Sequence, residues 1–162
     1  MNDHRDFFSA VSALATIEQL DVEAMRLLYR VERSGEDFYE MIAARIGNSE
    51  AADLLRRNAR EERGHAERMR RAIAIKLGGA FEPGPEDVAR YDITLPDAIP
   101  AAMLPLIVQG ELDGDVGYQR WADRESDPEV QRLLRLNGRE ETVHGQRVQQ
   151  VMAILEGRSA DG

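Results

Sequence analysis

Hydrophobic residues recur every three or four positions through most of the chain, and this spacing predicts amphipathic α-helices rather than strands. Gly47 ends the first long segment, and Asn48 or Ser49 is suited to cap the next helix. That second helix is expected from about residue 49 to 77, before Gly78 and Gly79. The apolar face of the first helix, within residues 21–46, consists of Val22, Met25, Leu28, Tyr29, Phe38, Ile42 and Ile46.

The second half of the chain predicts two more long helices. The third helix begins somewhere in 97–105, where Pro100 and Pro105 obscure its start, and runs to about residue 126. Asp127 then provides an N-cap, with Pro128 at the first helical position, for a fourth helix that runs to about Glu156. A short additional helix is expected within residues 4–19.

The connections between these helices predict how they pair. Short turns at 47–49 and 125–128 make two antiparallel hairpins, at about 21–78 and 97–156. The connection between the hairpins, at about 78–100, is long and rich in Gly and Pro. We therefore expect an all-α four-helix bundle in which the two hairpins are joined by a long crossover, with residues 1–162 forming a single domain.

The two predicted hairpins repeat each other. When the sequence is shifted by 79 residues, segment 54–68 aligns with segment 133–147 with nine identities in fifteen positions. The same shift aligns residues of the preceding helices, so the repeat covers both helices of each hairpin. A duplicated hairpin gives the bundle a pseudo-twofold axis, and a site on that axis would receive equal ligands from each half. The aligned pairs are Glu32 with Glu111, Gly35 with Gly114, Tyr39 with Tyr118 and Ala43 with Ala122.

Each half contains a Glu three positions before a His, and the two copies lie at the repeat offset. Residues three apart on a helix are neighbours on one face, with Cβ atoms roughly 5–6 Å apart. One Glu on the preceding helix of each half completes a set of four carboxylates and two imidazoles. This set is typical of two divalent metals in a bundle core. The candidate metal ligands are Glu32, Glu62, His65, Glu111, Glu141 and His144.

Electrostatic repulsion supports a metal site. Four carboxylates about 5 Å apart at an effective dielectric constant of about 20 repel by roughly 3 kcal/mol per pair, or roughly 20 kcal/mol in all. A domain has only about 5–15 kcal/mol of net stability. Such a cluster must be protonated, open to water or bound to metal, and two Fe(II) ions would neutralise it.

Several neighbouring residues have alternative interpretations. Glu36 is the main rival to Glu32, but Asp115 occupies its place in the repeat, so Glu32 is preferred. Tyr39 and Tyr118 follow these ligands by about two turns and could pack in the core, hydrogen-bond a ligand or pass an electron. Gly35 and Gly114 could leave room for a small oxidant or allow close helix packing. His4 has no Glu partner and is interpreted as a terminal residue, whereas Trp121 and Phe38 are expected in the core.

Composition narrows the classes of partner. The 162-residue chain is 43% hydrophobic and 31% charged, with a net charge of −9. This acidic balance argues against nucleic acid or an anionic membrane as a partner and is compatible with cations. The absence of cysteine excludes disulfides, thiolate metal sites and thiol catalysis within the sequence. No secretory signal or membrane span is evident, so a cytoplasmic location is expected.

The segment VERSGEDFYEMIA, followed by EERGH, resembles the ferritin-like di-iron superfamily and is most similar to its rubrerythrin-type branch, without a rubredoxin domain. The resemblance covers about residues 20–156. It implies a ferritin-like bundle in which the six candidate residues bind two iron ions, with manganese or a mixed pair as alternatives. It further implies that Glu62 and Glu141 bridge the metals.

The chain departs from the rubrerythrin pattern at two points. Rubrerythrins carry an additional ligand Glu one turn after the third-helix Glu, where this chain has Gly114. They also often carry a cysteine-ligated electron-transfer domain, and this sequence has no cysteine. The symmetric ligand set is therefore closer to bacterioferritin, and electrons must come from an external donor or from Fe(II) itself.

The expected function is oxidation of Fe(II) with oxygen or hydrogen peroxide by a di-iron oxidoreductase, which we expect to be a homodimer. One alternative is a ferritin-type iron-storage subunit that assembles into a cage. Another is a metal-binding module without turnover, or an enzyme that acts on an organic substrate.

Overall fold

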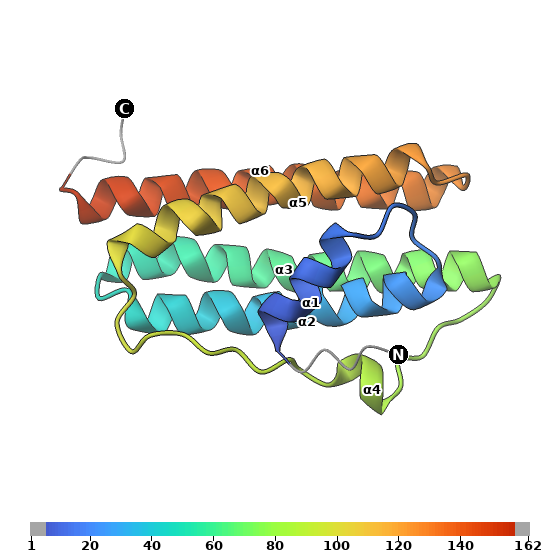
Figure 1. Ribbon diagram of the computed structural model, residues 1–162, viewed down its shortest axis with the longest axis horizontal. Helices are drawn as coiled ribbons and strands as arrows, with labels where there is room; N and C mark the ends of the chain where they lie inside the picture. Colours follow the sequence, from blue (N-terminus) through green and yellow to red (C-terminus); the bar gives the residue numbers. More distant parts are fainter. Residues whose placement is uncertain (1–5, 158–162) are drawn as a thin grey trace.

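A computed structural model of the chain describes residues 6–157, which form a bundle of long helices (Figure 1). These residues contain no strand; Asp6 and Asp92 form an isolated bridge. The N-terminal half comprises α1 (Phe7–Ala15), α2 (Val22–Arg45) and α3 (Ser49–Leu77). The remainder comprises α4 (Pro85–Val88), the 3₁₀ turn η1 (Ala101–Met103), α5 (Leu104–Asp123) and α6 (Pro128–Leu155).

The ends of the long helices follow the predicted signals. The Asp21 side chain accepts a hydrogen bond from Ala24 N at the start of α2, and Asn48 caps α3 in the same way. Asp127 caps α6, as the sequence predicted. Gly78, with φ of +69°, ends α3 in the left-handed conformation that favours glycine.

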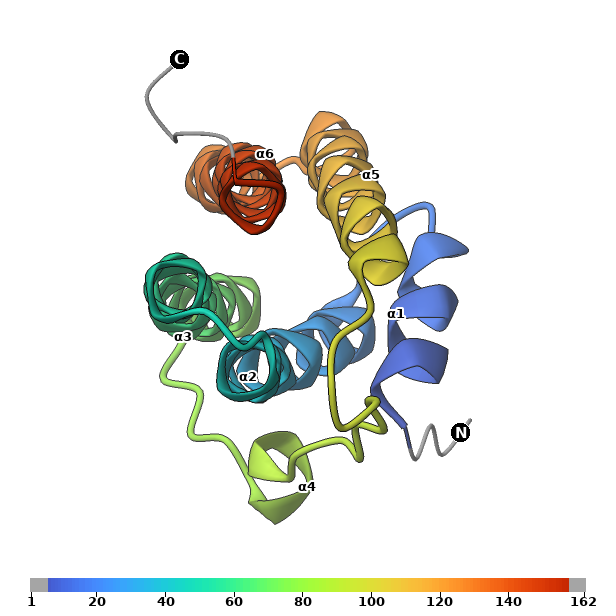
Figure 2. The same cartoon turned by 90° about the vertical axis from the view of Figure 1, so that its left-hand side faces the viewer.

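The four long helices form two antiparallel hairpins, α2 with α3 and α5 with α6, and α3 packs against α6 between them (Figures 1 and 2). The crossover from α3 to α5 carries α4, which lies beside α2 on the outside of the bundle (Figure 2). The predicted all-α bundle of two repeated hairpins with a long crossover is therefore confirmed.

Two prolines mark where the third long helix, α5, begins. Pro100 precedes η1, and Pro105 lies in the first turn of α5, where its missing N–H is tolerated. The short helix expected within residues 4–19 is α1, while α4 was not predicted because its four residues give no periodic pattern. His4 lies outside the described residues.

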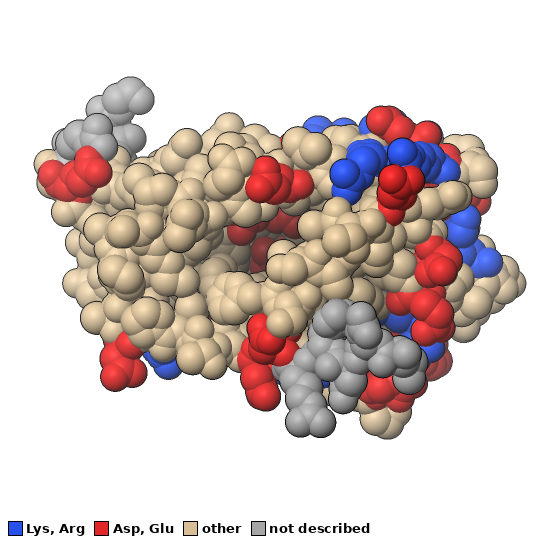
Figure 3. Space-filling model, in the orientation of Figure 1, with Lys and Arg blue, Asp and Glu red and all other residues tan. Residues whose placement is uncertain are grey.

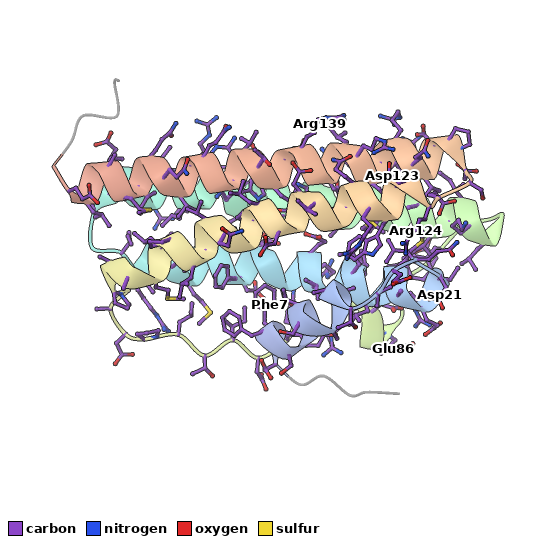
Figure 4. The ribbon with its side chains drawn as sticks, turned by 45° about the horizontal axis from the view of Figure 1, so that its top comes forward. Phe7, Asp21, Glu86, Asp123, Arg124 and Arg139 are labelled. Carbon is purple, nitrogen blue, oxygen red and sulfur yellow. The ribbon has the colours of Figure 1, made fainter. Side chains whose placement is uncertain are left out.

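Helix α1 packs against α2, and the loop that follows α1 is hydrogen-bonded to the end of α5. The indole Nε1 of Trp121 donates to the carbonyl oxygen of Ile17 at 2.7 Å. Arg124, at the end of α5, donates at 3.1 Å to both the carbonyl oxygen and the carboxylate of Glu18. Figure 4 labels Arg124, and it also labels Phe7 at the start of α1. Helix α1 thus lies across the side of the bundle between α2 and α5 (Figure 2).

The interior is apolar except for a few buried polar side chains, all of which lie within the long helices except Asp87 of α4. Trp121 and Phe38 are buried, as expected for core residues. Within the described residues, no helix is long and apolar enough to cross a bilayer. The buried polar residues are Glu32, Ser34, Asn58, Glu62, His65, Asp87, Asn137, Glu141 and His144.

Candidate metal centre

The six residues predicted as metal ligands come together inside the bundle. Each hairpin supplies three of them, because the E-x-x-H pair faces inward from α3 or α6 and the partner Glu faces it from α2 or α5. Ligand atoms of Glu62, His65, Glu141 and His144 lie within 4.8 Å of one another, and all four residues are buried. Glu32 approaches this group at His65, and Glu111 approaches it at His144.

Each imidazole directs its Nδ1 atom at three carboxylates. His65 Nδ1 lies 3.5 Å from an oxygen of each of Glu32, Glu62 and Glu141. His144 Nδ1 lies 3.3 Å from oxygens of Glu62 and Glu141 and 3.7 Å from Glu111. Glu62 and Glu141 therefore approach both histidines, whereas Glu32 and Glu111 each approach one.

The two Nδ1 atoms provide a test of whether metals fit this cluster. Both are buried and lack a hydrogen-bond partner, although carboxylate oxygens surround them. A buried polar atom without a partner costs free energy that a folded chain rarely leaves uncompensated. A histidine nitrogen with three carboxylate groups around it forms a suitable donor set for a divalent transition metal, so the residues present fit a metal site.

The other nitrogen of each histidine is held by a carboxylate and an arginine. His65 Nε2 lies 2.9 Å from Glu140 Oε2, and Arg68 donates two hydrogen bonds to Glu140 at 2.8 and 3.0 Å. In the other half, His144 Nε2 lies 3.1 Å from Glu61, which accepts two hydrogen bonds from Arg147 at 2.6 and 2.8 Å. Such partners fix the ring orientation of a ligating histidine.

In each half, the arginine and the histidine are bridged by a buried asparagine that comes from the other half. Asn137 accepts from Arg68 at 2.9 Å and donates at 3.2 Å to the backbone carbonyl oxygen of His65. Asn58 makes the corresponding contacts with Arg147 and His144. Both residue pairs lie at the 79-residue offset, so the repeat contained a signal for these residues, although they were not among the predicted site residues.

Comparison with known proteins shows a similarity of both sequence and fold. Residues 3–76 match the family described as Rubrerythrin. The chain also resembles the structure of the bacterioferritin-related protein from Bacteroides fragilis, described as a dodecameric thioferritin. That similarity has a TM-score of 0.59 at 19% sequence identity and covers 93% of this chain and 95% of the other.

The chain has a ferritin-like fold. The predicted resemblance to the ferritin-like superfamily is thereby confirmed, and the buried Glu and His cluster fits a di-iron protein. No curated protein matches the chain.

The two tyrosines connect the hairpins of this ferritin-like bundle. The hydroxyl of Tyr39 on α2 donates a short hydrogen bond to Glu111 on α5. The hydroxyl of Tyr118 on α5 donates a short hydrogen bond to Glu32 on α2. Both tyrosines are buried, and each orients a carboxylate of the opposite hairpin. Of the alternatives weighed for them, hydrogen bonding to a candidate ligand is the one that the geometry provides.

The glycines one turn after the α2 and α5 ligands face carboxylates and are not equivalent. A Cβ atom at Gly35 would lie 3.1 Å from Cδ and Oε2 of Glu62, a close contact that would displace that carboxylate. A Cβ atom at Gly114 would approach Glu141 Cγ at an ordinary 3.5 Å. Gly35 therefore makes room for Glu62. Glu36, the rival of Glu32, pairs with Arg63 and Arg90 away from the cluster.

The electrostatics of this ferritin-like site reflect four carboxylates packed away from water. Burial raises the pKa of Glu32 to about 8, and the charges of Glu62 and Glu141 add to that effect. Burial, followed by the charge of Glu141, also raises the pKa of Glu111 well above its ordinary value. Without metal, these two outer carboxyl groups thus tend to keep their protons.

For the inner carboxylates and the histidines, the pKa shifts in the direction opposite to the one that burial alone would produce. Burial favours the neutral acid of Glu62 and Glu141, but their contacts with the two histidines outweigh it and lower both pKa values. Burial also favours neutral imidazole, yet the surrounding carboxylates raise the pKa of His65 and His144. In the absence of metal, protonated histidines partly balance the acidic cluster, and bound cations would take over that role.

Proposed function

We propose that this protein is a di-iron oxidoreductase that oxidises Fe(II) with oxygen or hydrogen peroxide. The observation that carries the proposal is the pair of buried, unpartnered Nδ1 atoms of His65 and His144, each facing three carboxylates. A structural bundle has no use for such an arrangement, because four crowded carboxylates, three of them buried, and two buried imidazoles cost stability unless cations bind among them.

The residues of the chain have distinct roles in this proposal. One metal position would use Glu32 and His65, and the other would use Glu111 and His144. Both positions would share Glu62 and Glu141. Two iron ions held there, or a manganese or mixed pair, would supply Lewis acidity and electrons for an oxidant. The tyrosine hydroxyl groups restrain the two outer carboxylates.

The electron source is proposed to be Fe(II) itself or an external donor. The sequence contains no cysteine that could hold a rubredoxin-type iron. We further propose a cytoplasmic homodimer that has neither a nucleic acid nor a membrane partner, in keeping with its net charge of −9.

Stopped-flow oxidation tests the proposal. Protein loaded anaerobically with Fe(II) is mixed with oxygen or with hydrogen peroxide, and the absorbance of ferric iron is followed. Glu62→Gln, which alters a carboxylate shared by both positions, is expected to slow oxidation by at least about 100-fold, as loss of a group used directly in the reaction does. The matched control is Glu67→Gln on the same helix, whose side chain is 64% exposed. Oxidation no faster than that of free Fe(II) would contradict the proposal.

Iron storage is the second candidate function. It is favoured by the similarity to a protein described as a dodecameric thioferritin and bacterioferritin-related. Light scattering before and after addition of a large excess of Fe(II) separates the two functions. A cage that retains many iron ions per chain would support storage, whereas a dimer that releases its ferric product would support the oxidoreductase.

A further inference from the structure

A large cavity opens onto the candidate metal centre from one side of the bundle. Its volume is about 770 Å³, and it lies between α1, α2 and α5. Within the described residues, α2 and α5 are not among the closely packed helix pairs, so the cavity occupies the space where the two hairpins diverge. Figure 3 shows this face hollowed, with acidic atoms at the bottom of the hollow and uncharged atoms around it.

Aromatic residues are concentrated around this cavity, which we name the aromatic pocket. The chain has nine aromatic residues, four Phe, four Tyr and one Trp, and six of them line the pocket. Their rings form two groups in contact, Phe7, Phe8, Phe38 and Tyr39 in one and Tyr118 with Trp121 in the other, and Phe7 is stacked on Phe38 at a centroid distance of 5.4 Å. Aromatic walls favour an occupant with a ring, because ring pairs add stabilisation beyond the area that they bury. The six residues are Phe7, Phe8, Phe38, Tyr39, Tyr118 and Trp121.

The floor of the aromatic pocket accepts hydrogen bonds and disfavours anions. Its carboxylates are those of the candidate metal ligands Glu32, Glu62, Glu111 and Glu141. The protein's own phenol groups already donate to two of them, since Tyr118 bonds to Glu32 and Tyr39 to Glu111. An aromatic hydroxyl on a ligand would make the same kind of contact, whereas a carboxylate or sulfonate would have to bury its charge in a pocket lined mostly by apolar side chains.

The dimensions of the aromatic pocket suit a small molecule. Ligand sites are typically concave, about 300–1,000 Å³, mostly apolar and provided with a few convergent polar groups. The mouth is marked by exposed apolar side chains, with Leu106 72% and Val116 65% exposed on α5 and Phe8 43% exposed on α1. A second copy of the chain could cover this mouth but would leave the depth of the cavity to be filled.

We propose that the aromatic pocket binds a small uncharged aromatic molecule bearing a hydroxyl group, with the ring among the aromatic side chains and the hydroxyl at the carboxylate floor. The role of the occupant rests on the proposed function, because only beside two bound metals would it act as a substrate or effector of that site.

The binding test uses the full-length, metal-free protein and 1-naphthol as the probe. Trp121 lines the pocket and is the one tryptophan of the chain, so its fluorescence reports occupancy directly. Titration with 1-naphthol is expected to give a saturable change in Trp121 emission and one site per chain by calorimetry. The anion 1-naphthoate, of similar shape, is expected to bind at least about tenfold more weakly.

Filling the pocket provides the matched variants. Gly110 on α5 lines the pocket, and a Cβ atom there would meet nothing within 4 Å. Gly110→Leu therefore occupies the cavity while improving helix propensity, and it is expected to weaken 1-naphthol binding at least about tenfold. Gly64→Leu on α3, outside this pocket, is the control and should bind the probe like the unaltered protein.

A second readout places the probe relative to the floor. With the metal site loaded with Mn(II), the paramagnetic ion should accelerate proton relaxation of bound 1-naphthol in the unaltered protein and in Gly64→Leu, but not in Gly110→Leu. The fluorescence titration needs no metal, so failure of the metal proposal would leave it unaffected.

Four results would overturn the inference, three from the binding tests and one from sedimentation. The first is a linear, non-saturable response of Trp121 to 1-naphthol. The second is equal affinity in Gly110→Leu and the unaltered protein, and the third is a bound probe that bound Mn(II) does not relax. Sedimentation is run alongside. If the probe binds only after Leu106→Glu converts an oligomer to monomers, a second copy of the chain fills the mouth and the small-molecule assignment is wrong.

Discussion

The imidazole rings of His65 and His144 lie stacked, with centroids 5.1 Å apart and planes 16° from parallel, although 79 positions separate them in the sequence. Their Nε2 atoms face glutamates paired with arginines, and their Nδ1 atoms face the shared carboxylates Glu62 and Glu141. The duplication of the helical hairpin thus becomes an approximate twofold symmetry of the site, from which the following predictions are derived.

Gly35→Ala and Gly114→Ala should differ although the residues are repeat equivalents. Both changes improve helix propensity by about 1 kcal/mol. At position 35, however, the new methyl group would lie 3.1 Å from the Glu62 carboxyl group, whereas at position 114 its contact with Glu141 is an ordinary 3.5 Å. Gly35→Ala is therefore expected to weaken Mn(II) binding about tenfold or more, with little change for Gly114→Ala. Calorimetric titration measures both, and equal affinities would show that Glu62 is free to move.

Glu140→Gln and Glu61→Gln should weaken metal binding without removing a ligand. Each glutamate accepts at one histidine Nε2 and is held by an arginine, and loss of such a partner typically costs 10–100-fold in metal affinity. The neutral amide also offers an N–H group in place of an acceptor, which disfavours the required tautomer. Competition with a chromogenic chelator measures the affinity. Glu67→Gln, at an exposed position, should behave like the unaltered protein.

The double variant Glu32→Gln with Glu111→Gln should stabilise the metal-free protein. Both carboxyl groups are packed among like charges, and an amide can still accept the tyrosine hydrogen bond. Thermal melting in the presence of a chelator is expected to shift upward by about 3 °C or more, corresponding to roughly 1 kcal/mol. Glu40→Gln with Glu67→Gln, both at exposed positions, is the charge-matched control. A lower melting temperature for the Glu32 and Glu111 variant would mean that repulsion is not the dominant cost.

Stability of the metal-free protein should fall as the pH rises from about 5 to 8. The folded pKa of Glu32 is raised to about 8, from an ordinary value of 4.5, so in this range the folded state holds a proton that the unfolded state releases. The raised pKa values of Glu111, His65 and His144 act in the same direction. The lowered pKa values of Glu62 and Glu141 act in the opposite direction, but only at pH values below their ordinary value.

Melting curves in chelator at pH 6 and pH 8 measure this effect, and a decrease of about 3 °C or more is expected. The metal-loaded protein is the control. Because bound cations replace the protons, its melting temperature should not follow the same decrease. A metal-free protein that becomes more stable over this range would show that these carboxyl groups are open to water.

The convergence of Glu32, Glu62 and His65 with their repeat equivalents could be predicted because it depends on local geometry. A three-residue spacing fixes a Glu and a His on one helix face whatever the tertiary structure, and short turns fix the hairpins. The roles of Asn58 and Arg147 could not be predicted in this way, since they depend on how α3 and α6 approach each other. Their repetition at positions 137 and 68 was the available signal.

The aromatic pocket also could not be predicted from the sequence. Phe38 and Trp121 were predicted in the core, and they are buried, but burial against a cavity and burial within close packing have the same hydrophobic signature. The distance between α2 and α5 determines which applies, and no local spacing encodes that distance. Gly35 likewise could be read as space for an oxidant until Glu62 was seen to occupy the space.

The most direct test of the central claim is the number of metals bound per chain in the unaltered protein and in single histidine variants. Anaerobic Fe(II) or Mn(II) titration with elemental analysis should give two ions per chain. His65→Ala and His144→Ala should each lower the affinity of one ion more than the other, and anomalous scattering from crystals should show the loss next to the altered residue. One ion or none in the unaltered protein, or two fully occupied positions in both variants, would contradict the account.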